Sequence, residues 1–179
     1  MLLESEQVRF RSLELADAPV FVRWSENRLV TQYSLSQFNW PHSLQDIKNW
    51  LSGINQNHQS FHVGICCKKT GELIGYAGIT QMSMINRSAE FFILIGEQRY
   101  WSRGIGSEVA RLVTEYGFQR FNLNRIFLTA YSNNIQAIKA YENAGFIHEG
   151  VLRQAGFRQG QYLDKVMMSA LAKDARHKT

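Results

Sequence analysis

The chain has 179 residues, a formal net charge of +5 and a hydrophobic fraction of 45%, which suits one domain with one core. No apolar run approaches the length of a membrane span, and no shift in composition marks a linker, so we expect a single domain over residues 1–179 and no membrane partner. The basic residues are spread along the chain rather than clustered, which argues against a nucleic-acid partner.

The cysteine and histidine content argues against a disulfide bond and against a metal site. Cys66 and Cys67 are adjacent on a predicted strand, so their side chains point to opposite faces and no bridge between them is expected. Free thiols, together with acidic Glu4 and Glu6 where a secretory signal would be apolar, favour a cytoplasmic protein. The five histidines are scattered, so no metal site is predicted.

The first part of the chain reads as a strand followed by two helices. Residues 8–13 alternate between apolar and polar side chains, as in a half-buried strand. Asp17 stands where it could cap the first helix. Ser43 followed by Asp46 resembles a capping box, and the apolar residues after it share one helical face as far as Ile54.

The second part alternates strands and helices. The predicted order is a strand pair at 60–67 and 72–82 across the turn 68–71, a strand at 87–96, a helix at 105–120, a strand at 125–131, a helix at 134–144 that ends at Gly145, and two last strands at 146–153 and 162–171. The whole chain is therefore a mixed α/β protein.

The turn from the strand at 89–96 into the next helix carries a glycine pair, Gly104 and Gly106. The first N–H groups of a helix lack internal partners, and glycines let an anion approach them, so this turn is suited to holding phosphate. A P-loop would need Lys and Ser or Thr after its second glycine, but Ser107 and Glu108 stand there. A dinucleotide fingerprint would need a third glycine where Val109 stands, so another phosphate ligand is expected.

Two motifs together carry a resemblance to a known family. The stretch Trp101–Gly106 (WSRGIG) is similar to the pyrophosphate loop Q/R-x-x-G-x-G/A, and Asn134–Phe146 is similar to N-x-x-A-I-x-x-Y-E-x-x-G-F. Both belong to the GNAT superfamily of acetyl-CoA-dependent N-acetyltransferases. The stretches 73–79 and 160–168 resemble the branch with the ribosomal-protein N-terminal, spermidine and amino-sugar acetyltransferases. One departure is Trp101, which stands at the family's Gln or Arg position.

The resemblance implies a fold and a cofactor site. The fold would be a single-domain GNAT fold, with a mixed central sheet of about seven strands that splays at the cofactor cleft and about four flanking helices. Acetyl-CoA would be the cosubstrate, with its pantetheine arm against the backbone of one strand and its pyrophosphate at the helix start. The residues expected to bind it are Ile93, Leu94, Ile95, Trp101, Ser102, Arg103, Gly104, Ile105, Gly106, Ser107 and Asn134.

Acetyl transfer to nitrogen requires a neutral amine, whereas an alkyl amine with a pKa of about 10 is protonated at pH 7. The resemblance implies that Tyr141 reprotonates the leaving thiolate; a core tyrosine is the alternative. Glu90 is the candidate general base, and a salt-bridged or exposed side chain is the alternative. Asn134 either binds pantetheine or caps its own helix. No activated Ser or Cys is evident, which favours direct transfer in a ternary complex.

The acceptor is a primary amine whose identity the motifs leave open. The irregular segment after the first helix offers Tyr33, Phe38 and Trp40, which would suit a protein N-terminus or an amino sugar unless they only cover the core. This segment, from Trp24 to Trp40, has only Glu26 as an acidic residue, which argues against a polyamine as the acceptor. The departure at Trp101 keeps open a second class of function, a non-catalytic CoA-binding sensor or interaction module. A homodimer is an open alternative for the assembly.

Overall fold

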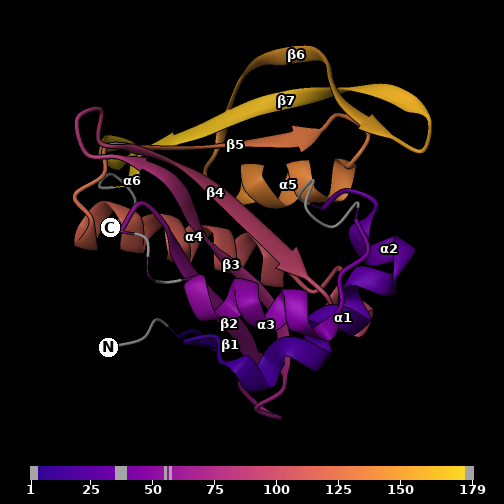
Figure 1. Ribbon diagram of the computed structural model, residues 1–179. Coiled ribbons are helices and arrows are strands. Elements are labelled where there is room, and N and C mark those ends of the chain that lie inside the picture. The colour runs from indigo at the N-terminus through magenta and orange to yellow at the C-terminus, as the bar shows by residue number, and fades with distance from the viewer. Residues whose placement is uncertain (1–3, 35–39, 55, 57, 176–179) are drawn as a thin grey trace.

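A computed structural model describes residues 4–34, 40–54, 56 and 58–175. These residues form one seven-stranded mixed sheet in the order β1-β2-β3-β4-β5-β7-β6, with helices on both faces (Figure 1). The elements are β1 (Val8–Arg11), α1 (Ala18–Glu26), α2 (Arg28–Thr31), α3 (Leu44–Gly53), β2 (Phe61–Cys67), β3 (Leu73–Ser83), β4 (Ser88–Ile95), α4 (Ile105–Arg120), β5 (Arg125–Tyr131), α5 (Ile135–Asn143), β6 (Ile147–Arg158), β7 (Gln161–Leu171) and α6 (Ala172–Ala175). The predicted order of elements and number of strands are confirmed, and the one-turn helices α2 and α6 add to the four longer ones.

Local signals explain most element boundaries, with one exception. The capping box of α3 is formed, because Ser43 Oγ accepts from the Asp46 N–H and the Asp46 carboxylate accepts from the Ser43 N–H. Asp17 is the N-cap residue of α1, as predicted, but its side chain makes no cap hydrogen bond to this helix. Its carboxylate instead accepts from the Glu14 N–H and forms an ion pair with Arg11, which ties the start of α1 to β1.

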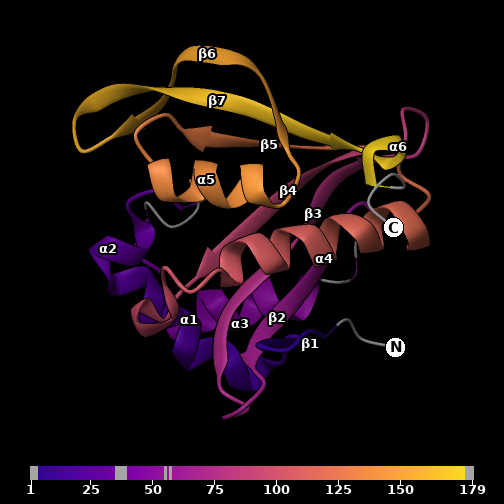
Figure 2. The ribbon, with the colours of Figure 1, turned by 180° about the vertical axis from the view of Figure 1, so that it is seen from behind.

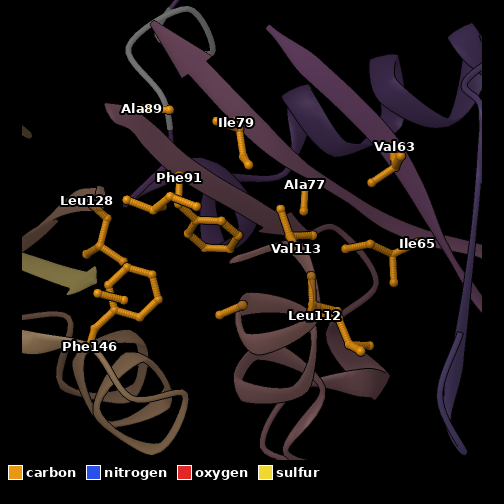
Figure 3. Close-up of a cluster of buried hydrophobic side chains, with 14 of the residues drawn as sticks. Val63, Ile65, Ala77, Ile79, Ala89, Phe91, Leu112, Val113, Leu128 and Phe146 are labelled. Carbon is orange, nitrogen blue, oxygen red and sulfur yellow. The ribbon is translucent and has the colours of Figure 1, made fainter. Parts of the chain in front are cut away.

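Two apolar layers lie between the sheet and the helices, one on each face. One lies under α4 and α5 and includes Val109 of α4 and Ile138 of α5. Figure 3 shows part of this layer, with Leu112 and Val113 of α4 near Ile65 and Ala77 of the strands. The other lies under α1 and α3 on the opposite face. Cys66 belongs to the second layer and Cys67 to the first, and both thiols are free, so the predicted opposite orientation is confirmed.

The sheet opens between its two central strands. β4 and β5 run parallel and pair only at one end, where Ser88, Ala89 and Glu90 lie opposite Arg125, Ile126 and Phe127. Beyond this point the strands diverge, as Figures 1 and 2 show from both sides. α4 and α5 cover one face of the divergence, and α2 lies near its open end. The backbone edge of β4 that faces β5 is therefore left without a strand partner after Glu90.

Candidate active site

A cavity of about 460 Å³ lies at the open end of the divergence. Its walls come from the second half of β4, the segment that leads into α4, one side of α5, and α2 with the residues after it. The lining residues are Leu29, Val30, Gln32, Tyr33, Ser34, Ile93, Leu94, Ile95, Tyr100, Trp101, Ser102, Gly104, Ile105, Gly106, Ser107, Asn134, Gln136, Ala137, Lys139, Ala140, Tyr141 and Asn143. Ten of the eleven residues expected to bind the cofactor are thus brought together; Arg103 is the one that does not line the cavity.

The glycine loop is shaped as an anion cradle. Gly104 is the N-cap of α4 and has a φ of 78°, a left-handed conformation that favours glycine. A Cβ on Gly104 would meet no protein atom within 4 Å, so the space beside this backbone is open. The first intrahelical bond runs from the Glu108 N–H to the Gly104 carbonyl, which leaves the N–H groups of the first turn of α4 free of helical partners. Ser102 Oγ accepts from Gln136 Nε2 at 2.9 Å, a bond that holds the loop against α5.

The edge of β4 presents alternate backbone groups to the cavity. The Gly96 N–H donates to the Ile74 carbonyl of β3, so in an antiparallel pair the backbone groups of Leu94 also face β3. Those of Ile93 and Ile95 then face the diverging side. The pantetheine contacts expected of residues 93–95 are therefore open to the backbone of Ile93 and Ile95, whereas the backbone hydrogen-bonding groups of Leu94 are directed to β3.

Trp101 contacts this edge directly. Its indole Nε1 donates to the Ile95 carbonyl at 2.8 Å, and its ring packs against the apolar layer under α1 and α3. The side chain at the family's Gln or Arg position thus connects the glycine loop to the end of β4 through a hydrogen bond. Arg103, the next cation, extends outward with its guanidinium 5.6 Å from the centre of the Tyr100 ring.

Tyr141 lies on the face of α5 that borders the cavity. Its ring packs at 6.1 Å against the rings of both Phe91 and Phe146. Burial raises the pKa of its hydroxyl to about 12, so the phenol is protonated at neutral pH. Among the residues that the structure describes, the hydroxyl has no hydrogen-bond partner. It is a proton donor without an acceptor, at the wall of an open cavity.

The position of Asn134 is compatible with both roles considered for it, capping α5 and binding pantetheine. Its side-chain oxygen accepts from the Ala137 N–H at 3.3 Å, so it caps α5. It also lines the cavity. The cap uses the oxygen and leaves the amide NH₂ group available to a ligand.

Glu90 lies where β4 and β5 separate and does not line the cavity. By strand alternation its side chain shares a face with Phe92 and Leu94, which belong to the layer under α1 and α3. Its carboxylate accepts from Gln81 Nε2 at 2.6 Å. Burial raises the pKa of this carboxyl, and the positive charge of Lys165 opposes the rise. Phe91, which touches Tyr141, is on the other face, so the two candidate catalytic groups approach β4 from opposite sides.

The three aromatic residues expected at the acceptor site have different positions. Tyr33 lines the cavity, with its ring 6.1 Å from that of Tyr131. Trp40 is 72% exposed and does not line the cavity. Phe38 falls outside the described residues.

Several lining residues escaped the sequence interpretation. On α5, Gln136, Ala140 and Asn143 lie on the side that turns toward the glycine loop, and their spacing of three to four residues was a usable helical signal. Leu29, Gln32 and other residues around α2 carry no local signal, because only the folding of the chain brings this short helix to the open end of the cleft. Within the described ranges there is no group of three or more His, Cys, Asp or Glu side chains that could hold a metal ion.

Comparison with known proteins agrees with this arrangement. A family model described as an acetyltransferase (GNAT) domain matches residues 7–147. The uncharacterized N-acetyltransferase p20 of Bacillus licheniformis is 28% identical, over 96% of this chain and 97% of its own length. Spermidine N(1)-acetyltransferase of Escherichia coli (strain K12) is 33% identical over 61% of this chain and 59% of its own. The crystal structure of spermidine N-acetyltransferase from Vibrio cholerae in complex with CoA and spermine superposes with a TM-score of 0.84, at 26% identity over 96% of this chain and 99% of the other.

Proposed function

Because the chain belongs to the GNAT acetyltransferase family and is an N-acetyltransferase, we propose that it transfers the acetyl group of acetyl-CoA to a primary amine by direct attack in a ternary complex. One observation carries the proposal. A single cavity joins an anion cradle at the start of α4, an unpaired backbone edge on β4 and the unpartnered hydroxyl of Tyr141. These are the three features that a diphosphate, an extended amide-bearing arm and a leaving thiolate require.

Acetyl-CoA would enter along the glycine loop. The N–H groups at the start of α4 would bind the pyrophosphate, where the helix dipole adds partial positive charge. The pantetheine amides would pair with the backbone of Ile93 and with the Ile95 N–H, since the Ile95 carbonyl already accepts from Trp101. Lys139 lines the same cavity and would supply a cation to the phosphates.

The chemical step would form a C–N bond and break a C–S bond. Glu90, with its raised pKa, would take a proton from the ammonium group of the acceptor, directly or through water. The neutral amine would attack the thioester carbonyl, and a backbone N–H at residues 93–95 would stabilise the oxyanion. Tyr141 would donate its proton to the leaving thiolate. The apolar site that raises the pKa of the phenol also disfavours the thiolate anion, so the proton affinities of the two groups rise together.

The placement of these groups favours direct transfer over an acyl-enzyme. Glu90 and Tyr141 lie on opposite faces of β4, so an amine could approach one side of the thioester while the thiol leaves on the other. Neither Cys66 nor Cys67 lines the cavity, and both are buried within the apolar layers. The free thiols also support a reducing, cytoplasmic setting for the protein.

The acceptor is proposed to be a protein N-terminus or a small amine such as an amino sugar. The curated relatives include spermidine acetyltransferases, and one structural neighbour holds spermine. A polyamine carries several positive charges, however, and residues 27–41 contain no Asp or Glu. No carboxylate lines the cavity within the described part of the chain either.

The test is release of free thiol from acetyl-CoA with a panel of peptides, amino sugars and polyamines, with the acetylated product identified by mass spectrometry. Turnover with any primary amine is expected. Tight binding of acetyl-CoA without turnover of any acceptor would contradict the proposal. It would instead favour the alternative raised by Trp101, a non-catalytic CoA-binding module.

A further inference from the structure

We infer that the amine acceptor carries an oxyanion group, a carboxylate or a phosphate, which binds to Arg158 in a second cavity beside the acceptor end of the active site. The inference rests on the proposed function, since it specifies the substrate class of the same site. The second cavity has a volume of about 130 Å³. Its lining residues are Gln32, Tyr33, Asn133, Arg158, Gln159, Gln161 and Leu163. Gln32 and Tyr33 also line the larger cavity, so the two spaces share a wall.

Arg158 is held in place by two hydrogen bonds, and three of its five N–H donors have no partner among the described residues. Its Nη2 donates to the Ser34 carbonyl at 2.8 Å and its Nη1 to the Phe157 carbonyl at 2.9 Å. The guanidinium also lies 5.1 Å from the centre of the Tyr131 ring. Its Nε is buried and has no hydrogen-bond partner. A fixed guanidinium that lines the second cavity and has unused N–H donors can bind an acceptor atom there, and oxyanions are the partners that match its geometry best.

Arg158 has no carboxylate partner among the described residues, whereas the nearby Lys165 interacts electrostatically with Glu90. Lys165 Nζ lies 5.0 Å from the centre of the same Tyr131 ring, so two cations flank one aromatic side chain. Among the described residues, Arg158 forms no ion pair, and no Asp or Glu lines the second cavity. The unpaired charge of Arg158 at the second cavity therefore favours an acceptor with a negatively charged group there.

The alternative is that Arg158 has only a structural role and joins β6 to the segment after α2. The bond to the Ser34 carbonyl supports such a role, because these residues are far apart in sequence. A purely structural role needs only the bond from Nη2, so loss of Arg158 would then affect every acceptor equally. An oxyanion site would affect only acceptors that carry the anion. The two roles therefore differ in a measurable pattern.

The experiment compares matched acceptors and matched variants. Straight-chain ω-amino acids and ω-aminoalkyl phosphates are assayed against unsubstituted alkylamines of the same length, with spermidine as the polycation, and kcat and KM are measured by thiol release. Arg158→Gln removes the proposed contact, and Arg153→Gln is the control, since Arg153 is exposed on the same strand and lines neither cavity. Arg158→Lys keeps the charge but not the fork. Circular dichroism checks that every variant folds.

The wild type should prefer one oxyanion series over the alkylamines by about tenfold or more in kcat/KM, and the better series identifies carboxylate or phosphate as the group bound. Arg158→Gln should raise KM for that series by about 10- to 100-fold, the range of one charge-assisted hydrogen bond. Its kcat/KM for alkylamines should stay within about threefold. Arg153→Gln should match the wild type, and Arg158→Lys should fall between the two.

Three results would overturn the inference. The first is a wild-type preference for alkylamines or spermidine. The second is an equal loss of kcat/KM for all acceptors in folded Arg158→Gln, which would mean that Arg158 has only a structural role. If no amine in the panel is acetylated, the proposed function fails separately. The oxyanion site is then tested by calorimetric titration of the same ω-amino acids and aminoalkyl phosphates into CoA-loaded protein. Binding that Arg158→Gln abolishes supports the site, and absence of binding is the third overturning result.

Discussion

Replacing Tyr141 by Phe should lower turnover and leave the stability of the fold almost unchanged. The ring contacts with Phe91 and Phe146 are kept, and only the hydroxyl is removed. Loss of a positioned general acid typically costs about 10²- to 10⁴-fold, so we expect kcat to fall at least about a hundredfold, with little change in acetyl-CoA affinity. The effect should extend over the whole accessible pH range, because a phenol with a pKa of about 12 stays protonated throughout it.

Stability should change little, because the Tyr141 hydroxyl borders the open cavity and is not one of the buried polar atoms without a partner. Water in the cavity can hydrogen-bond the hydroxyl in the free protein, so its removal relieves no buried unpaired group. We expect the free energy of unfolding to stay within about 1 kcal/mol of the wild-type value, which corresponds to a change in Tm of at most about 2–4 °C for a domain of this size.

Thiol release at saturating acetyl-CoA gives kcat, and thermal unfolding followed by circular dichroism gives Tm. Tyr116→Phe is the matched control, because Tyr116 stacks on Phe61 at 5.0 Å and does not line the cavity. Wild-type kcat in Tyr141→Phe would remove the residue from the reaction. A large drop in Tm would mean that the substitution disturbs the packing of the ring, and the loss of kcat could then not be assigned to the hydroxyl.

Gly104→Val should weaken acetyl-CoA binding by about 10- to 100-fold in calorimetry, since it places a side chain in open space beside the free N–H groups and strains a backbone with φ 78°; wild-type affinity in a folded variant would mean that the anion binds elsewhere. Glu90 must lose its proton to act as a base, and because burial raises its pKa, the acid limb of kcat/KM should lie at higher pH than for an ordinary Glu. Glu90→Gln should remove that limb and lower turnover, whereas an unchanged profile would make the residue structural. Trp101→Phe should lower the free energy of unfolding by about 0.5–1.5 kcal/mol in denaturant titration by removing the indole bond to Ile95, and no change would show that this bond contributes nothing.

The two family motifs of the candidate site could be recognised in the sequence because each is local. The glycine loop and the α5 motif each lie within about a dozen residues, and their backbone conformations follow from the glycines and from helical periodicity. The seven strands and four longer helices were found in their correct order for the same reason. Asp17 shows the limit of local rules, because its partner Arg11 competed successfully with the helix start for the carboxylate.

The acceptor end was decided by tertiary structure alone. Register fixed which backbone groups of β4 face the cleft, so Ile93 and Ile95 are available and Leu94 is not, a distinction that an apolar run cannot express. Long-range packing placed Arg158, far along the chain, beside Ser34 and Tyr33. The sequence by itself determined the family motifs, the order of elements and the glycine turn at the start of α4, because these depend on neighbouring residues. The shape and charge of the acceptor site depend on which distant side chains share one space, and only the folded chain establishes that.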